Sequence, residues 1–120
     1  MFDLLLNNIA KYIHLTGEEK TTFIAHLKPF PIKRKKFILN EGEICRNSVF
    51  VTEGCLRGFT VDKNGIEHVL SFAPPGWWIA DMYSLISQKP GILNIEALED
   101  TEAIILSKAG QETLYHEVPK

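Results

Sequence analysis

The chain has 120 residues, of which 45% are hydrophobic and 23% charged, with a formal net charge of -2 at pH 7. This length suits one domain with a modest core, so we expect residues 1–120 to form a single domain. The slight acidity argues against direct DNA binding, because neutralising phosphates requires a basic face. Two cysteines are too few for a disulfide framework or a four-cysteine iron–sulfur cluster, and no apolar run is long enough to span a membrane. The sequence therefore predicts a cytoplasmic protein.

Two helices are predicted at the start of the chain. Residues 2–13 carry apolar side chains at three- and four-residue intervals, which is the spacing of one helical face. Thr16 and Glu19 fit a capping box that begins a second helix, and we expect this helix to run to about Leu27. We interpret residues 1–28 as a helical lid packed on a β core.

From residue 30 to residue 107 the pattern changes to short runs of β-branched and aromatic residues. Glycines punctuate these runs at intervals of about 11 residues, a spacing typical of an all-β roll or barrel. The glycines are Gly42, Gly54, Gly65 and Gly76. Asn64-Gly65 predicts a hairpin turn, because both residues tolerate positive φ. We expect a mainly β fold with flanking helices: about eight antiparallel strands in a jelly roll, also called a double-stranded β-helix.

Residues 72–98 combine a turn, a short strand, a short helix and another strand. Pro74, Pro75 and Gly76 end one strand, because proline lacks a backbone donor. Trp77 and Trp78 are adjacent in an extended run, so one ring should face the core and the other solvent. The helix is expected at residues 81–88, capped by its first residue, and such a helix start presents backbone amides that suit an anion.

This stretch resembles the phosphate-binding cassette of cyclic-nucleotide-binding domains, as found in Crp/Fnr-type bacterial transcription regulators. That cassette reads roughly Gly-x-x-x-Gly-Glu-(Leu/Ile)-x-Leu, followed by Arg-(Ser/Thr)-Ala. The segments 37–43, 49–57 and 62–68 resemble hairpins and turns of the same family in the same order, and 99–107 resembles its last two-strand corner. The resemblance covers nearly the whole chain and implies a cyclic-nucleotide-binding β-roll.

The resemblance also assigns pocket positions to individual residues. Gly76 matches the leading glycine of the cassette, and Met82 matches its apolar position. Ala80 stands where the second glycine belongs, and Asp81 stands where the ribose-binding glutamate belongs. The inward-facing tryptophan of the pair 77–78 is expected to fill the space that a nucleotide base would take.

The phosphate positions lack the chemistry of the family. Gly91 falls where the phosphate-binding arginine belongs, and Ile92 falls where serine or threonine belongs. A buried cyclic phosphate needs a cation, ideally a bidentate guanidinium, and Gly91 offers none. Arg57 could supply the missing charge if it points inward, and is a surface residue if it points outward; Lys89 is the nearest cation in sequence. We therefore expect a degenerate pocket that does not bind cyclic AMP.

The remaining reactive residues give weaker signals. Residues 33–36 form a dense basic run, which either contacts an acidic partner or nucleic acid or, as we favour, forms a solvated edge strand whose lysines block further pairing. No two of the four histidines are close in sequence, so we expect neither a cupin-type metal site nor a cofactor. Cys45 and Cys55 are interpreted as inert thiols. Without a nucleophile–base pair or a glycine-rich phosphate loop, we do not expect an enzyme.

Residues 108–117 are predicted to form a terminal helix, with Ser107 as its cap. In Crp/Fnr regulators a dimerisation helix and a helix-turn-helix domain follow the roll, and neither fits in the residues that remain here. The resemblance implies a homodimeric effector-sensing domain with an unknown small-molecule effector or none, which reaches DNA only through a helix-turn-helix domain absent from these residues. The alternatives are a stand-alone β-roll interaction module with a vestigial pocket and, less favoured, a cupin-like metal enzyme.

Overall fold

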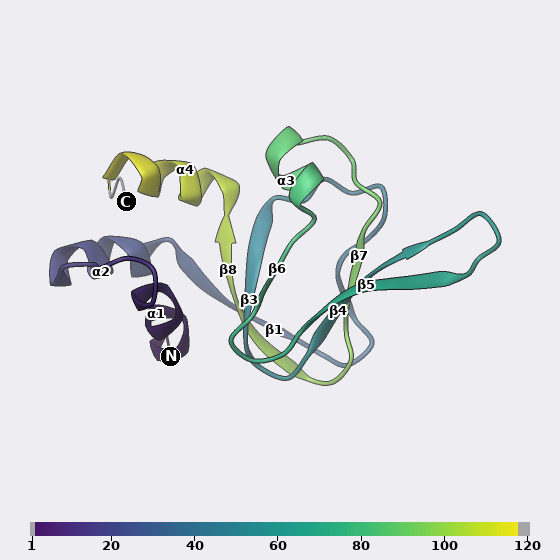
Figure 1. The fold of residues 1–120 in the computed structure, drawn as a ribbon, viewed down its shortest axis with the longest axis horizontal. Coiled ribbons are helices and arrows are strands. Elements are labelled where there is room, and N and C mark those ends of the chain that lie inside the picture. Colours follow the sequence, from purple (N-terminus) through teal and green to yellow (C-terminus); the bar gives the residue numbers. More distant parts are fainter. Residues whose placement is uncertain (1, 118–120) are drawn as a thin grey trace.

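Residues 2–117 are described here from a computed structural model, in which α1, α2 and α4 lie at one end of a β-roll. The elements are α1 (Asp3–Ala10), α2 (Gly17–Ala25), β1 (Leu27–Ile32), β2 (Phe37–Leu39), β3 (Asn47–Glu53), β4 (Leu56–Val61), β5 (Glu67–Ala73), β6 (Trp78–Ile79), α3 (Met82–Ser87), β7 (Asn94–Ala97), β8 (Thr101–Ser107) and α4 (Lys108–Glu117). Figure 1 shows α1, α2 and α4 together on one side and the β4–β5 hairpin projecting on the other. The predicted mainly β fold with flanking helices is confirmed.

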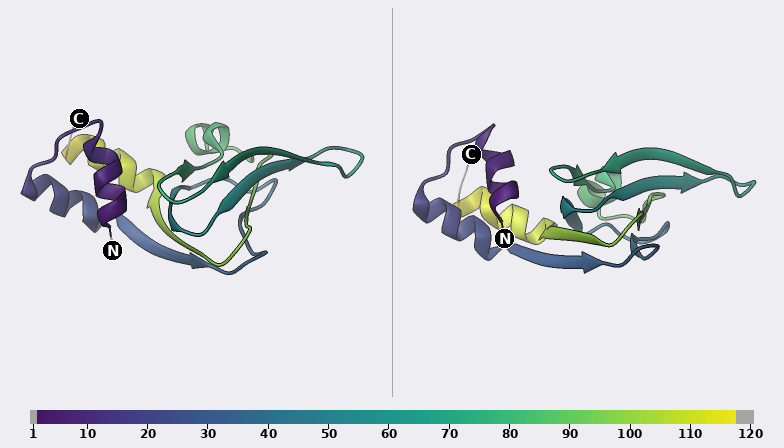
Figure 2. Two further views of the ribbon diagram at one scale, coloured as in Figure 1. Left: turned by 60° about the horizontal axis from the view of Figure 1, so that its bottom comes forward. Right: turned by 90° about the horizontal axis from the view of Figure 1, so that it is seen from below.

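The strands form two antiparallel four-stranded sheets, with the orders β1-β8-β3-β6 and β2-β7-β4-β5. The two sheets lie as facing layers (Figure 2). Apart from the β4–β5 hairpin, each strand lies in the opposite sheet from the strand before it, which is the winding of a double-stranded β-helix. The core between the layers takes side chains from both sheets, among them the fully buried Val51, Leu56 and Ile95.

In the sheet β1-β8-β3-β6, the middle of strand β3 is buried on both faces. In β3, Val49 and Val51 pack inside the roll, whereas Phe50 between them packs against the helices. Leu5 of α1 and Phe23 of α2 belong to this second cluster on the outer face. Residues of α1 and α2 therefore pack on the outer face of this sheet, and within residues 2–117 no helix covers the outer face of the other sheet.

Two helix boundaries differ from the prediction. The capping box is confirmed: Glu19 N donates to Thr16 Oγ1 at 3.1 Å, and Thr16 N donates to Glu19 Oε1 at 2.9 Å. However, α2 ends at Ala25, and Leu27 already pairs with β8 as the first residue of β1. The prolines of β1 are tolerated because β1 is an edge strand of its sheet. The first helix likewise ends early, at Ala10.

The predicted glycine turns are confirmed. The φ angles are 88° at Gly42, 94° at Gly54, 80° at Gly65 and 89° at Gly76. The hairpin turn predicted at Asn64-Gly65 forms between β4 and β5, with a positive φ at Gly65 and not at Asn64. Asp62 organises the hairpin instead, since its Oδ1 accepts hydrogen bonds from Asn64 N at 2.8 Å and Ile66 N at 3.1 Å.

The basic run 33–36 forms the loop between β1 and β2, so its assignment to an edge strand was wrong. Lys35 adopts a positive φ of 69°, which a strand does not accommodate. Asp100 holds the loop: its Oδ1 accepts from Arg34 N at 2.9 Å, and its Oδ2 lies 3.9 Å from Lys33 Nζ. The four side chains are exposed, as expected.

Candidate functional site

Asp81 begins α3 and is almost fully buried, with 8% of its surface exposed. Its Oδ1 accepts from Ser84 N at 3.1 Å, which confirms the predicted cap. Its Oδ2 accepts from Leu93 N at 3.3 Å, in the loop that follows the helix. The carboxylate is therefore used by two backbone amides of the chain itself.

Gly91, which the resemblance predicts to stand at the arginine position, lies directly against this carboxylate. A β-carbon at Gly91 would collide with Asp81 Oδ2 and would lie 3.0 Å from the β-carbon of Ser84. The backbone of Gly91 is also fixed, because its carbonyl accepts from Gly42 N at 2.9 Å and its N–H donates to Glu43 O at 3.2 Å. The structure thus brings positions 81 and 91 together, in a contact that leaves no room for a side chain at 91.

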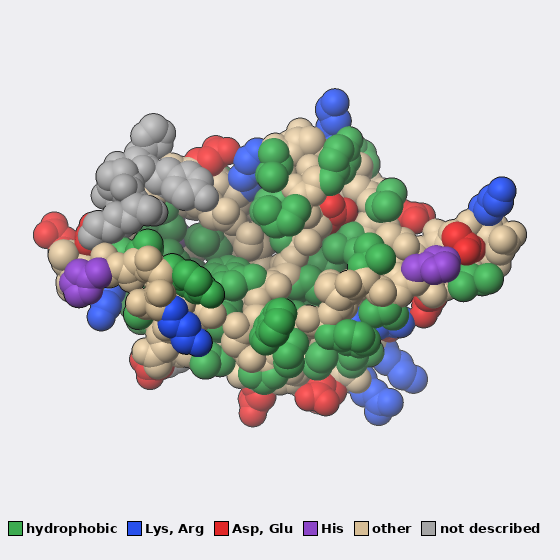
Figure 3. Space-filling view, in the orientation of Figure 1, with side chains coloured by type: hydrophobic (Ala, Val, Ile, Leu, Met, Phe, Trp, Pro, Cys, Tyr) green, Lys and Arg blue, Asp and Glu red, His purple; other side chains and the backbone are tan. Residues whose placement is uncertain are grey.

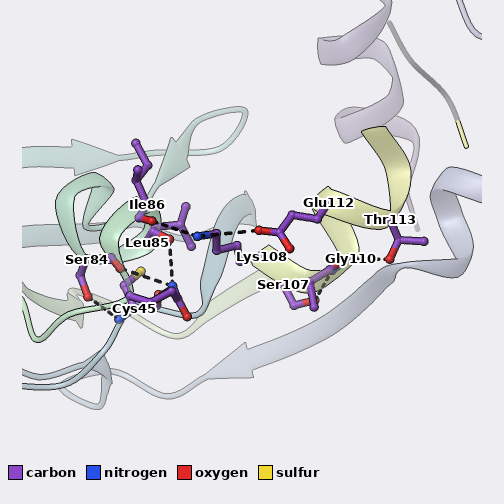
Figure 4. A network of polar contacts seen from close by, with 11 residues as sticks. Cys45, Ser84, Leu85, Ile86, Ser107, Lys108, Gly110, Glu112 and Thr113 are labelled. Carbon is purple, nitrogen blue, oxygen red and sulfur yellow. Dashed lines mark hydrogen bonds and ion pairs between the residues drawn. The ribbon is translucent and has the colours of Figure 1, made fainter. Parts of the chain in front are cut away.

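A polar network ties α3 to the loop between β2 and β3 (Figure 4). The hydroxyl of Ser84 accepts from Cys45 N at 2.7 Å and donates to Lys89 O at 2.6 Å. The amide of Gln88, the left-handed residue after the helix, donates to Cys45 O at 3.1 Å and to Leu85 O at 2.8 Å. These contacts hold the helix in one position relative to the roll.

Lys108 extends this network to the terminal helix. Its Nζ donates to Ile86 O at 2.9 Å and lies 3.8 Å from Glu112 Oε1 within α4 (Figure 4). A cation is favoured there, because the last carbonyls of a helix lack intrahelical donors. Ser107 caps α4 as predicted, accepting from Gly110 N at 2.9 Å. Sequence reasoning missed the role of Lys108, because no local pattern reveals a partner 22 residues away.

A depression of about 290 Å³ lies beside the start of α3. Its lining consists of Ser48, Ser71, Trp78, Ile79, Ala80 and Met82. Three of the predicted pocket residues therefore meet here, at positions 78, 80 and 82. The lining offers two hydroxyl groups and no charged side chain, so a ligand in it would be held mainly by apolar contact.

Arg57 is occupied on its own sheet and is not part of this lining. Its Nε donates to Glu96 Oε1 at 2.8 Å, and its Nη2 lies 3.0 Å from Glu67 Oε1. The guanidinium also lies 4.1 Å above the centre of the Phe59 ring. Desolvation opposes its charge, but the bonds to Glu96 and Glu67 prevail and raise the pKa of Arg57. Ile92, predicted from the resemblance to stand at the serine or threonine position, is exposed and also lies outside the lining.

The two tryptophans take opposite environments, as predicted. Trp77 is 61% exposed, whereas the ring centre of Trp78 lies 5.0 Å from that of Phe50 in an edge-on arrangement. The indole Nε1 of Trp78 donates to Asn8 Oδ1 of α1 at 3.2 Å. The inward ring thus packs under the helical lid as well as forming one wall of the depression.

The described residues contain no group of three or more His, Cys, Asp or Glu side chains arranged to hold a metal ion. Desolvation raises the pKa of the buried Cys45 thiol and of the partly buried Cys55 thiol. A raised thiol pKa disfavours the nucleophilic thiolate. Between residues 2 and 117, none of the helices has the length and apolarity needed to cross a membrane.

Comparison with known proteins places this geometry in a family. The family model for the cyclic nucleotide-binding domain matches residues 29–117. No curated protein matches the sequence. Many solved structures share the fold, and the three described next all have sequence identities below 25%, so the likeness concerns the fold.

The catabolite activator protein of Thermus thermophilus superposes with a TM-score of 0.78 and 23% identity over 90% of this chain and 50% of that protein. The sensor domain of the transcriptional regulator DNR from Pseudomonas aeruginosa superposes with a TM-score of 0.77 and 11% identity. The match covers 98% of this chain and 81% of that one. The regulatory subunit of a cAMP-independent protein kinase A from Trypanosoma brucei superposes with a TM-score of 0.79 and 17% identity. The match covers 98% of this chain and 43% of that one. The chain spans half the length of the Thermus protein. Because the family model covers most of it, from β1 to α4, the chain belongs to the cyclic nucleotide-binding domain family.

Proposed function

We propose that the chain is the effector-sensing domain of a cytoplasmic, homodimeric Crp/Fnr-like transcription regulator. The family match and the fold shared with two bacterial regulatory proteins support this proposal. In such a regulator, DNA is read by a helix-turn-helix domain beyond the roll. A change of conformation at the pocket must then alter the position of α4, the helix that follows β8.

The observation that carries the proposal is the hydrogen bond from Lys108 Nζ to Ile86 O at 2.9 Å. It joins the end of α3, whose first residue Met82 lines the depression, to the first residue of α4. A movement of α3 by about 1 Å would break a bond of this length. An effector that displaces α3 therefore favours a different arrangement of α4, which is a population shift between two states.

We propose further that the effector is not cyclic AMP. The position aligned with the phosphate-binding arginine is Gly91, which packs on the Asp81 carboxylate, and Arg57 is already paired with two glutamates. A buried phosphate beside the negatively charged Asp81 carboxylate, with no cation to pair with it, would be strongly disfavoured. A protein of this fold from Trypanosoma brucei is itself named cAMP-independent. Calorimetric titration should detect no micromolar binding of cyclic AMP or cyclic GMP, and such binding would refute this part of the proposal.

A stand-alone interaction module is the second candidate, favoured by exposed apolar side chains on α3 and β5. These are Leu70, Phe72, Met82, Tyr83 and Ile86. In Figure 3 hydrophobic side chains gather over this face of the molecule. Such surface commonly marks a protein contact. In a regulator it would contact the partner subunit or the dimerisation helix, whereas in a stand-alone module it would bind another protein.

The two candidates are separated by an assay on the product of the complete reading frame. A regulator should retard promoter DNA in a gel and be dimeric by native mass spectrometry. Lys108→Met should change its DNA affinity, whereas Glu112→Gln, which keeps the bond to Ile86, should not. A product without DNA affinity would support the stand-alone module. Metal analysis of the same preparation tests the cupin-like alternative.

A further inference from the structure

A second hollow, of about 740 Å³, lies on the helical side of the cassette turn. Its walls are the end of α1 with the residues that follow it to Ile13, and the turn 76–78. It shares only Trp78 with the depression beside α3. We propose that this groove binds a small aromatic carboxylate, meaning a planar ring of indole or phenyl size that carries one carboxylate. The proposal does not depend on the regulatory function proposed above.

The groove is already in place without a ligand. The side-chain amide of Asn8 joins its two walls, since Oδ1 accepts from Trp78 Nε1 at 3.2 Å and Nδ2 donates to Gly76 O at 3.5 Å. The Trp78 ring is held in turn by Phe50. A site whose walls are fixed beforehand loses less entropy when it binds a ligand. The volume lies within the range of about 300–1,000 Å³ that is typical of small-molecule sites.

Two large aromatic side chains line the groove while remaining exposed. Tyr12 is 80% exposed and Trp77 is 61% exposed. Neither contributes to the two core clusters, so packing of the described residues does not explain them. A planar ligand ring would cover their apolar faces and gain stacking contacts. This accounts for the aromatic part of the proposed ligand.

The polar groups of the groove favour a ligand that carries a negative charge. Within residues 2–117, Lys11 Nζ, Tyr12 Oη and Trp77 Nε1 have no hydrogen-bond or ion-pair partner. All three are donors, and Lys11 is also positively charged. The acceptor Asn8 Oδ1 is already engaged, and no carboxylate side chain lines the groove. Free donors beside one cation suit a carboxylate and disfavour an amine.

The test uses ¹⁵N NMR on the full chain with three probes: indole-3-acetate, the amine tryptamine and uncharged indole. The chain has two tryptophans, so two indole N–H signals report directly on the groove. We expect indole-3-acetate to shift the Trp77 indole signal and the backbone amides of Lys11 and Tyr12, saturating at a concentration of about 1 mM or below. Tryptamine should give no saturable shift, and indole should bind more weakly than the acid.

Two variants and a matched control complete the test. Lys11→Gln should weaken indole-3-acetate binding about tenfold, because it removes a charge-assisted hydrogen bond. Trp77→Ala should also weaken binding, whereas Lys63→Gln, which changes another exposed lysine, on the β4–β5 hairpin, should not. The amide spectra of the free variants verify that each is folded. The proposal is refuted if no probe saturates, if the acid and the amine bind equally, or if Lys11→Gln binds as well as the native chain.

Discussion

The carboxylate of Asp81 lies against the α-carbon of Gly91, where any other residue would place its β-carbon. The two positions are therefore coupled. As long as Asp81 caps α3 and accepts from Leu93 N, position 91 must remain glycine. A side chain as large as arginine therefore cannot be accommodated at position 91 while Asp81 keeps these two hydrogen bonds.

Gly91→Ala should lower the free energy of unfolding by about 2 kcal/mol, because the new methyl group meets Asp81 and the Ser84 β-carbon. Urea denaturation measures this change. Gly17→Ala is the matched control, since a β-carbon there has open space and should be neutral or slightly stabilising. The double variant with Asp81→Ala should be less destabilised than the sum of the single variants. Strict additivity would show that the two residues do not interact.

Gly54 and Gly42 form a second matched pair. Both have positive φ, but a β-carbon at Gly54 would lie 2.6 Å from Thr101 Oγ1 and 2.7 Å from Asp100 O, whereas Gly42 has open space. Gly42→Ala should cost about 1 kcal/mol of stability, from backbone strain alone. Gly54→Ala should cost clearly more, because the turn must also move away from β8. Equal melting temperatures of the two variants would contradict this packing.

The tryptophans should differ strongly in their effect on stability. Trp78→Ala removes a ring that packs on Phe50 and donates to Asn8, so it should cost about 3 kcal/mol. Trp77→Ala should stay within about 0.5 kcal/mol, because the ring is largely exposed. Thermal unfolding of both variants checks the difference. If neither variant melts lower than the native chain, the placement of β6 is incorrect.

Lys108→Met should loosen the contact between α3 and α4 without removing a buried group. Amide hydrogen exchange near Ile86 and in the first turn of α4 should increase about threefold, the value of one modest hydrogen bond. Glu112→Gln is the control, because it removes the longer ion pair and keeps the bond to Ile86. If exchange increases only in Glu112→Gln, the ion pair within α4, and not the bond from Lys108 to Ile86, stabilises this region.

Thiol chemistry tests the raised pKa values. Desolvation favours the neutral thiols of Cys45 and Cys55, so iodoacetamide should leave Cys45 unmodified in the folded protein and modify Cys55 slowly. Because the pKa of Cys55 is raised, its rate should still be rising above the pH at which ordinary thiols have fully ionised. Both should react in denaturant. Rapid modification of Cys45 near neutral pH would show that the β2–β3 loop opens.

Several local features of the site could be predicted from the sequence. The cap at Asp81, the capping box of α2 and the four turn glycines depend on backbone preferences that act within a few residues. The opposite environments of Trp77 and Trp78 follow from the alternation of an extended chain in the same way. The exact turn type of the Asn64-Gly65 hairpin could not be predicted from this dipeptide alone. The Asp62 side chain stabilises a different turn by accepting hydrogen bonds from two backbone amides.

The sequence by itself determined the mainly β pattern, the glycine turns and the lack of a charged side chain at position 91, since each depends on residue type and local spacing. Only the tertiary structure decided where the functional side chains go. Arg57 meets Glu96 across 39 residues, and Lys108 meets Ile86 across 22, through the pairing and packing of separate strands and helices. Such contacts depend on how the sheets and helices pack together, so they cannot be predicted from the neighbouring residues in the chain.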